Sequence, residues 1–223
     1  MNVLVINGSP KGERSDTMKL TQVFLKGMEV DAEIIDTMQT PVRPCLGCYA
    51  CWYKTPGRCI QDDGMAAILA KFREADLVIW STPLYCYSIP SNCKALLDRL
   101  LPLSTPVQYT DENGHTHHPG RAEKFARQML ISGCGFPDRE GNYDALIFQF
   151  RRMFGADSPM ILCTEAPLLS VPEAAPVAKP YLALVEKAGA EFKTTGTITN
   201  ETQAALDTPM LPPDEYRNDV NSR

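Results

Sequence analysis

The chain has 223 residues, of which 44% are hydrophobic and 22% are charged, and its formal net charge is −5. This length and apolar fraction fit one α/β domain with room for an insertion or a tail. The negative charge argues against nucleic acid as the main partner. No apolar run approaches the ~20 residues of a membrane span, and a predicted strand starts at the N-terminus without a signal peptide, so we expect a cytoplasmic protein.

The first 17 residues predict a strand, a loop of small polar residues and the start of a helix. Residues 3–6 are all apolar, as in a strand buried on both faces of a parallel sheet. Two glycines and a proline in residues 7–12 end the strand, and Ser15 or Asp16 is the expected N-cap of the helix. The segment matches neither the Walker pattern nor Gly-x-Gly-x-x-Gly. Its hydroxyl groups and the helix N-terminus fit a bound monophosphate such as that of FMN, with an ordinary capped turn as the alternative.

The rest of the chain alternates apolar strands with amphipathic helices. Further strands are expected at 33–36, 76–82, 125–132 and 159–163. Helices with apolar residues on one face are expected at 65–72, 91–101, 144–154 and 174–190. Residues 102–122, with prolines, glycines and all three histidines, are expected to form a surface excursion. The last ~20 residues predict a loosely held or partner-binding tail.

This order of elements predicts an α/β fold, a doubly wound sheet of five parallel strands with helices on both faces. The domain is expected to span residues 1–190, including the cysteine loop 44–60, and residues 191–223 form a C-terminal extension. In such sheets a ligand binds outside the carboxyl ends of the strands, where the winding direction switches. Loops 7–17, 83–90 and 133–137 are predicted to meet there.

Three short motifs in these loops occur in the order found in one family. They are Asn7-Gly-Ser-Pro with Ser15 and Thr17, then Thr82-Pro-Leu-Tyr85, then Ser132-Gly-Cys-Gly135. The chain thereby resembles the flavodoxin-like NAD(P)H-dependent FMN reductases, and within them the iron–sulfur flavoproteins. The resemblance implies a flavodoxin-like fold that binds FMN, with the residues Ser9, Lys11, Ser15 and Thr17 at the phosphate, Pro83, Leu84, Tyr85 and Cys86 along the isoalloxazine, and Gly133 and Cys134 nearby. A Pro-Leu-Tyr turn after a strand also offers the flat apolar wall that a flavin needs.

Eight cysteines in a chain without a secretion signal point to metal binding, redox chemistry or burial. Four of them have the spacing Cys-x2-Cys-x2-Cys-x7-Cys, at Cys45, Cys48, Cys51 and Cys59. The first three can wrap one corner of a 4Fe–4S cluster, as in ferredoxin-like runs, and Cys59 would close the fourth site. Zinc, a redox dithiol or disulfide, and a metal-free loop over the flavin are the alternatives. The resemblance implies a 4Fe–4S cluster next to FMN, although the gap before Cys59 is slightly long for that motif.

The other cysteines and the histidines give weaker signals. Cys93 and Cys163 fall in apolar segments and are expected to be small buried hydrophobic side chains. The histidines lie in a polar loop that we expect to be solvated rather than metal-binding. No Ser/His/Asp set and no paired acid/base carboxylates are evident. Flavin chemistry does not require them, because the cofactor carries the reaction, so no catalytic side chain is assigned.

The motifs predict an FMN-dependent oxidoreductase. It would pass electrons from a reduced nicotinamide, NAD(P)H, or a ferredoxin-type donor to a small acceptor, and a 4Fe–4S cluster would divide the two-electron flavin step into single electrons. The alternatives are a flavodoxin-like electron-transfer carrier without its own substrate and a scaffold that binds no flavin. Expected partners are small molecules or electron-transfer proteins, without nucleic acid or membrane. The resemblance also implies a homodimer or homotetramer with the cysteine loop and the tail at the subunit contacts.

Overall fold

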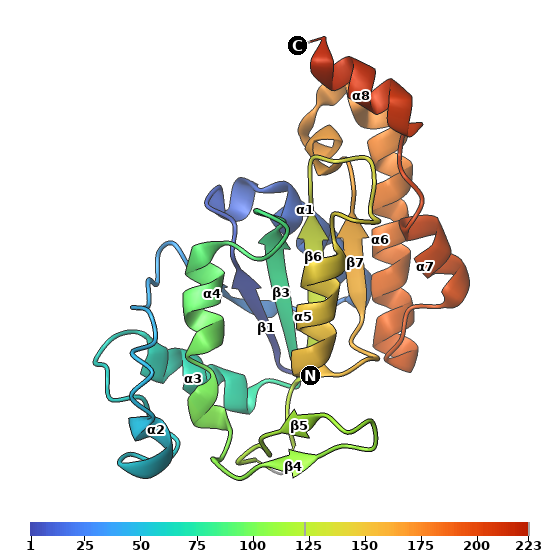
Figure 1. Ribbon diagram of the computed structural model, residues 1–223. Helices are drawn as coiled ribbons and strands as arrows, with labels where there is room; N and C mark the ends of the chain where they lie inside the picture. Colours follow the sequence, from blue (N-terminus) through green and yellow to red (C-terminus); the bar gives the residue numbers. More distant parts are fainter. Residues whose placement is uncertain (123, 223) are drawn as a thin grey trace.

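The computed structural model describes residues 1–122 and 124–222, which form one central sheet covered by helices (Figure 1). The sheet has five strands in the order β2-β1-β3-β6-β7, and every neighbouring pair is parallel. Its strands are β1 (Val3–Asn7), β2 (Ala32–Asp36), β3 (Leu77–Pro83), β6 (Arg127–Gly133) and β7 (Met160–Cys163). The predicted doubly wound flavodoxin-like sheet is confirmed, and its winding direction switches between β1 and β3.

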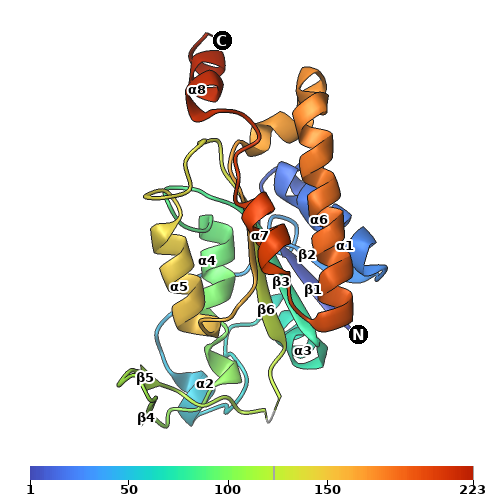
Figure 2. The same ribbon diagram turned by 90° about the vertical axis from the view of Figure 1, so that its right-hand side faces the viewer.

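Helices cover both faces of the sheet, so the strands are apolar on both sides. Val3 and Val5 of β1 pack in a core with α1 (Asp16–Met28) and α6 (Ala175–Thr195). The alternate residues of β1, Leu4 and Ile6, belong to the second core. Its helices are α3 (Met65–Glu74), α4 (Ser91–Asp98) and α5 (Asp144–Phe154). Figure 2 shows α1 and α6 on one side of the sheet and α4 and α5 on the other.

The backbones of α1 and α6 lie in direct contact. A Cβ added at Gly27 would lie 1.9 Å from the carbonyl oxygen of Glu186, and one added at Gly189 would lie 2.1 Å from that of Phe24. Glycine at both positions is therefore required for this close approach. The rings of Phe24 and Phe192 meet beside it, with centroids 5.7 Å apart.

The remaining elements are short. They are the 3-10 turns η1 (Gly12–Arg14), η2 (Leu101–Leu103), η3 (Ala166–Ser170) and η4 (Pro172–Ala174), the hairpin strands β4 (Tyr109–Thr110) and β5 (Thr116–His117), and the helices α2 (Ala50–Tyr53), α7 (Asn200–Leu206) and α8 (Pro213–Asn221). The antiparallel β4–β5 hairpin lies in the predicted excursion 102–122, where most residues are exposed. In the part of the chain described here, none of the helices is long and apolar enough to cross a membrane.

Three expectations about element boundaries are wrong. Helix α4 ends at Asp98, because Pro102 restricts the residue before it and cannot continue a helix. Strand β6 begins at Arg127, whereas the Phe125 side chain is half exposed and packs over Gly120. Helix α6 continues through the expected boundary at residue 190 to Thr195.

The end of the chain is not loosely held. Thr202 and Leu206 of α7 and Tyr216 of α8 are all buried, and Leu206 belongs to the core between the sheet and α6. The Tyr181 hydroxyl donates to the Leu206 carbonyl over 3.2 Å. The sequence gives a weak signal here because each helix buries only one or two side chains.

Candidate functional site

A cleft of about 160 Å³ lies at the carboxyl ends of β1, β3 and β6. The three predicted loops meet there, as expected at a switch point. The cleft is lined by Ser9, Lys11, Ser15, Asp16, Thr17, Pro83, Leu84, Tyr85, Gly133, Cys134, Gly135, Ala166 and Pro167. One wall is therefore a helix N-terminus with hydroxyl groups, and another is apolar.

The polar wall is the loop between β1 and α1. The Ser15 hydroxyl caps α1 by accepting a hydrogen bond from the Met18 N–H over 3.1 Å, and it lies 3.2 Å from the Thr17 hydroxyl. The N–H groups of Asp16 and Thr17 begin the helix, where no preceding helical carbonyl is available to them. The Ser9 side chain accepts from the Lys11 N–H over 3.3 Å. This wall presents backbone donors, hydroxyls and one lysine, which together suit a phosphate.

The second wall is the loop after β3. The Leu84 N–H donates to the Gly133 carbonyl over 2.9 Å, so this loop continues the pairing of β3 with β6. Tyr85 and Ser88 exchange two backbone hydrogen bonds around a tight turn. The two central residues, Cys86 and Tyr87, have φ angles of 48° and 63°. Side chains other than glycine rarely adopt this left-handed conformation, so the turn at the cleft is strained.

Gly133 and Cys134 form the floor of the cleft. A Cβ at Gly133 would lie 2.8 Å from the Ala166 Cβ and 3.4 Å from Thr17 Cγ2, so only glycine lets β6 end against α1. The Cys134 side chain is buried, and its thiol donates to the Phe136 carbonyl over 3.6 Å. Burial raises the pKa of this thiol. Cys134 is therefore a neutral packing group rather than a thiolate nucleophile.

The C-terminal segment contacts Glu165, the residue before η3 and next to Ala166 in the lining of the cleft. Glu165 is fully buried, with φ of 56°, and its Oε2 accepts from the N–H groups of Met210 and Leu211 over 2.7 and 3.1 Å. Burial raises its pKa, these two hydrogen bonds oppose the rise, and the charge of Asp138 adds to it. The Tyr216 hydroxyl donates to the Gly135 carbonyl over 3.1 Å.

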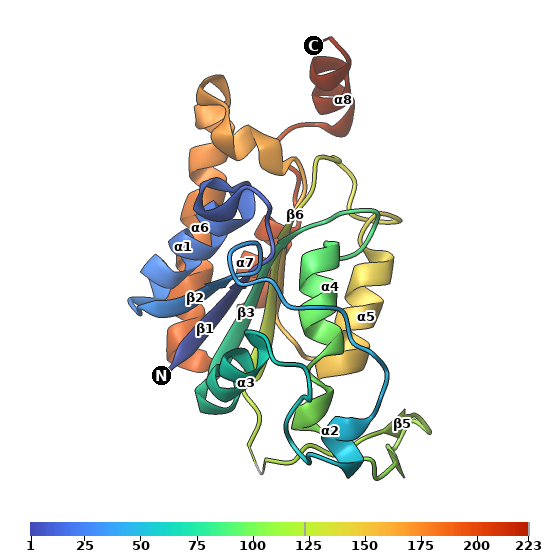
Figure 3. The same ribbon diagram turned by 90° about the vertical axis from the view of Figure 1, so that its left-hand side faces the viewer.

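The cysteine loop lies near the amino ends of the strands, at the opposite end of the sheet from the cleft. After β2 the chain passes α4 and reaches α2 near the β4–β5 hairpin, whereas the strands point toward the end near α8 (Figures 1 and 3). Trp52 of α2 donates from Nε1 to the Leu101 carbonyl over 3.1 Å. Strands of five to seven residues separate the edges by about 20 Å. The expectation that the cysteines lie next to the FMN site is therefore wrong within one chain.

The four cysteines of the motif nevertheless converge on one cavity. Cys45, Cys48, Cys51 and Cys59 line it together with Arg99. Burial raises the pKa of Cys51, and the neighbouring Cys59, Cys45 and Cys48 raise it further. Over residues 1–122 and 124–222, no three His, Cys, Asp or Glu side chains are close enough to hold a single metal ion.

Comparison with known proteins gives the family. Residues 1–130 match the model of the NADPH-dependent FMN reductases. The chain belongs to the NADPH-dependent FMN reductase family. It is an oxidoreductase by class.

Relatives of this FMN reductase family member carry two kinds of name. This chain is 32% identical over 133 residues to an iron–sulfur flavoprotein of Methanocaldococcus jannaschii, and the match covers 59% of this chain and 68% of that protein. This chain is 26% identical over 160 residues to an FMN-dependent NADH:quinone oxidoreductase of Pseudoalteromonas atlantica, and the match covers 66% of this chain and 78% of that protein. The matches span 48% to 68% of the length of four curated iron–sulfur flavoproteins.

The fold comparison agrees with the observed sheet. An FMN-dependent NADH-azoreductase from Bacillus anthracis, solved in complex with FMN, superposes with a TM-score of 0.63 at 19% identity. The superposition covers 86% of this chain and all of that one. At this identity the likeness concerns the fold alone.

The cleft of this FMN reductase family member contains most of the residues that the sequence predicted for FMN. Nine of the ten predicted FMN residues line it, and Cys86 does not, because the turn holds it at an exposed corner. The sequence analysis missed Asp16, Gly135, Ala166 and Pro167. Ala166 and Pro167 lie in η3, shortly after β7, whose carboxyl end reaches the same side of the sheet. The position of this fifth strand could therefore have predicted them.

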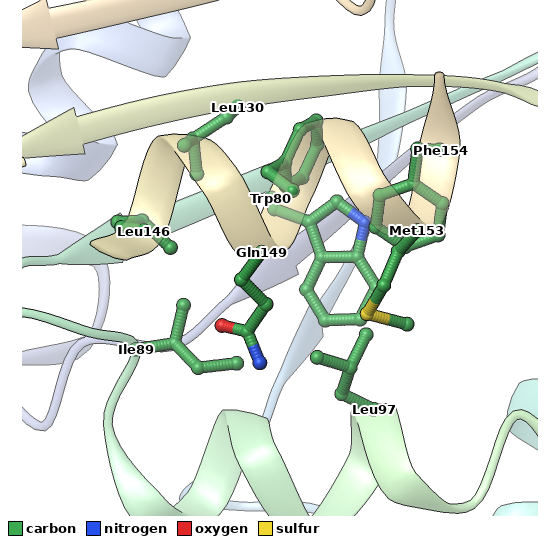
Figure 4. Close-up of a pocket in the computed structure, with 9 residues that line it drawn as sticks. Trp80, Ile89, Leu97, Leu130, Leu146, Gln149, Met153 and Phe154 are labelled. Carbon is green, nitrogen blue, oxygen red and sulfur yellow. The ribbon is translucent and has the colours of Figure 1, made fainter. Parts of the chain in front are cut away.

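A third cavity, much smaller than the cleft, does not resemble a binding site. It has a volume of about 10 Å³ and lies between α4 and α5, lined by Trp80, Leu97, Met153 and other mostly apolar side chains (Figure 4). A cavity of this size holds about one water molecule at most. It is a packing gap beneath the Trp80 ring, whose Nε1 donates to Gln128 over 2.9 Å.

The histidine loop and the isolated cysteines broadly follow their predictions. His115 and His118 are exposed, whereas His117 is partly buried and lies 2.8 Å from Asp111 Oδ2 and 3.0 Å from Arg152 Nη1. Cys93 and Cys163 are fully buried, and burial raises the pKa of Cys93 to about 12. Both thiols therefore stay protonated at neutral pH.

Proposed function

We propose that this chain is an FMN-dependent oxidoreductase that transfers electrons from NAD(P)H, or from a ferredoxin-type protein, to a small acceptor such as a quinone. The observation that carries this proposal is the meeting of the three loops in one cleft, with a helix N-terminus on one wall and an apolar loop on the other. The names of the relatives support the donor and the acceptor class.

In this proposal the chain's residues bind and orient FMN. The hydroxyls of Ser9, Ser15 and Thr17, the Lys11 ammonium and the first N–H groups of α1 hold the phosphate. Pro83, Leu84, Tyr85, Gly133 and Cys134 form the wall and floor for the ring. These residues would hold FMN so that it could supply hydride acceptance and onward electron transfer. The protein excludes water from one side of the ring and leaves the other open to the donor and the acceptor.

We further propose that Cys45, Cys48, Cys51 and Cys59 hold a 4Fe–4S cluster. The four thiols line one cavity, and thiolates are the usual ligands of such clusters. The buried Nε of Arg99 in this wall has no hydrogen-bond partner among the described residues, so a sulfide acceptor there would satisfy it.

The separation of the two sites supports a homodimer or homotetramer. Electrons moving within one chain between the cysteine loop and the cleft would have to cross the length of the sheet. Leu46 and Tyr53 of the cysteine loop are 67% and 70% exposed, and large exposed apolar side chains of this kind are typical of interaction surfaces. We propose that the cysteine loop lies at a subunit contact.

Anaerobic purification followed by an absorbance spectrum and assays for iron and sulfide tests these proposals. Flavin peaks with about four irons per chain support both sites. Flavin without iron, even after reconstitution, overturns the cluster and leaves the reductase. No flavin after addition of FMN overturns the central proposal. Light scattering at several concentrations then gives the oligomeric state, and a monomer that retains full activity contradicts the assembly.

Comparing the rates of flavin reduction by NADH, NADPH and a reduced ferredoxin gives the donor. A panel of quinones and azo compounds gives the acceptor class. If no donor reduces the bound flavin faster than it reduces free FMN, the enzymatic proposal is wrong.

A further inference from the structure

Arg99 is a buried cation in the wall of the cysteine cavity. It follows the last turn of α4, and its side chain is 1% exposed. Arginine is rarely buried so completely unless it is paired. Its two Nη atoms contact Asp63 as a fork, with Nη1 to Oδ2 at 2.5 Å and Nη2 to Oδ1 at 3.0 Å. Such a bidentate pair fixes the orientation of the guanidinium plane.

The fixed guanidinium makes two further contacts with the cysteine loop. Nη1 donates to the Arg43 carbonyl over 3.1 Å, two residues before the first cysteine of the motif. Nη2 donates to the Sγ of Cys59 over 3.1 Å. Both ends of the motif are therefore tied to one side chain. Asp63 completes the arrangement by accepting from the Arg43 N–H over 3.1 Å.

The segment before Cys59 forms a hydrogen-bonded turn, and this turn explains the long gap in the motif. The Thr55 hydroxyl donates to the Arg58 carbonyl over 2.9 Å, and the Gly57 N–H donates to the Cys51 carbonyl over 3.0 Å. Gly57 has φ of 80°, which favours glycine. The turn brings Cys59 back to the cavity, where Arg99 donates a hydrogen bond to its sulfur.

We propose that Arg99 is the positioning residue of this cysteine site: it holds the Cys59 sulfur in place as the fourth ligand and, through its N–H···S hydrogen bond, raises the reduction potential of the cluster. This inference rests on the proposed cluster. A hydrogen bond to a ligand sulfur stabilises the reduced form more than the oxidised form, because reduction adds negative charge to the sulfurs. Removing such an outer partner also weakens metal retention.

The test compares the reduction potential of the cluster and its loss to an iron chelator in wild type, Arg99→Met and the double variant Arg99→Met/Asp63→Asn. The double variant is needed because Arg99→Met alone removes the bidentate partner of Asp63, whose side chain is only 12% exposed, and the less compensated carboxylate would itself destabilise the fold and lower the potential. Arg43→Met is the matched control. It removes one positive charge beside Asp63, at a side chain that is 60% exposed, and leaves the contact with Cys59 intact.

We expect both Arg99 variants to have a more negative potential than wild type and to lose iron about tenfold faster or more. Arg43→Met should match wild type in both measurements. Arg99→Lys, which keeps the charge without the fork, should restore the potential only in part.

A double variant with the wild-type potential would overturn the role of the hydrogen bond, because the effect in Arg99→Met would then come from the charge of Asp63 after the loss of its bidentate partner. Equal potentials and equal iron loss in every variant would overturn the inference while leaving the cluster standing. A wild-type protein that binds no iron and sulfide would overturn the cluster and this inference together.

Discussion

The buried carboxylate of Glu165 accepts a hydrogen bond from the backbone N–H of Met210 over 2.7 Å. It thereby joins the end of β7, beside the cleft, to the segment between α7 and α8. The same carboxylate oxygen accepts from Leu211. Tyr216 of α8 reaches Gly135 on the cleft itself. The C-terminal segment is therefore hydrogen-bonded to residues at and next to the lining of the cleft, Gly135 and Glu165, without lining it itself.

Replacing Glu165 should change how stability depends on pH. Its pKa is raised above the ordinary value of 4.5, chiefly by burial. The stabilising effect of its protonated form is thus fully present below that value and is lost as the pH rises through the raised pKa. Glu165→Gln keeps an acceptor and cannot ionise, so its free energy of unfolding should fall less between about pH 4 and about pH 8.

Urea unfolding at several pH values measures this difference. Glu173→Gln, at an exposed glutamate in η4, is the control and should follow the wild-type profile. Parallel profiles for Glu165→Gln and wild type would contradict the prediction.

The two N-terminal caps with a side-chain hydrogen bond, at α1 and α7, allow stability and flavin affinity to be separated. Ser15→Ala and Thr199→Ala each remove a cap bond, to Met18 and Thr202 respectively, and each should lower the free energy of unfolding by about 1 kcal/mol. Only Ser15 lines the cleft, so only Ser15→Ala should weaken FMN binding, by about tenfold. Quenching of FMN fluorescence gives the affinities. Equal affinities in the two variants would mean that the Ser15 hydroxyl does not contact the phosphate.

The floor of the cleft contains Gly133 and Gly135, and only Gly135 should tolerate an added methyl group. Gly133→Ala places a Cβ 2.8 Å from the Ala166 Cβ and should cost about 1–3 kcal/mol of stability. The nearest atom to a Cβ at Gly135 is 3.9 Å away, in Pro167, so Gly135→Ala should unfold like wild type. Thermal unfolding of the proteins without flavin checks this. A Gly133→Ala protein as stable as wild type would show that β6 and η3 can move apart at no cost.

The strained turn at Cys86 should be relieved by a residue that accepts left-handed backbone. Cys86→Asn should raise the free energy of unfolding by up to about 1 kcal/mol, because asparagine adopts positive φ more readily. Ser88→Asn, in the same turn but without positive φ, is the control and should give no gain. A stabilised variant that also binds or reduces the flavin more slowly would connect the strain with function.

The sequence predicted those parts of the molecule that have local signals. Apolar runs such as residues 3–6 and 77–80 specify buried strands, and the glycine, serine and proline residues that follow them mark loops at the carboxyl edge. Because parallel strands place these loops side by side, most of the cleft could be predicted without a structure.

The position of the cysteine loop could not be predicted in this way. Residues 37–44 have no regular pattern, and their path along α4 is set by contacts among Arg43, Asp63 and Arg99, which are far apart in the sequence. The same reason applies to the end of the chain, where Leu206 and Tyr216 are isolated buried residues in mostly polar segments. A pattern of one buried residue has no period to detect.

The glycine contact between α1 and α6 has a consequence for synthesis. The apolar face of α1, with Leu20, Phe24 and Met28, leaves the ribosome early, but α6, which covers it, ends at Thr195. During translation this face therefore stays uncovered until α6 has emerged, and the loop at the start of α1 lacks its support for the same time. Residues 1–130, the part matched by the family model, are thus unsuitable as a separate folding unit.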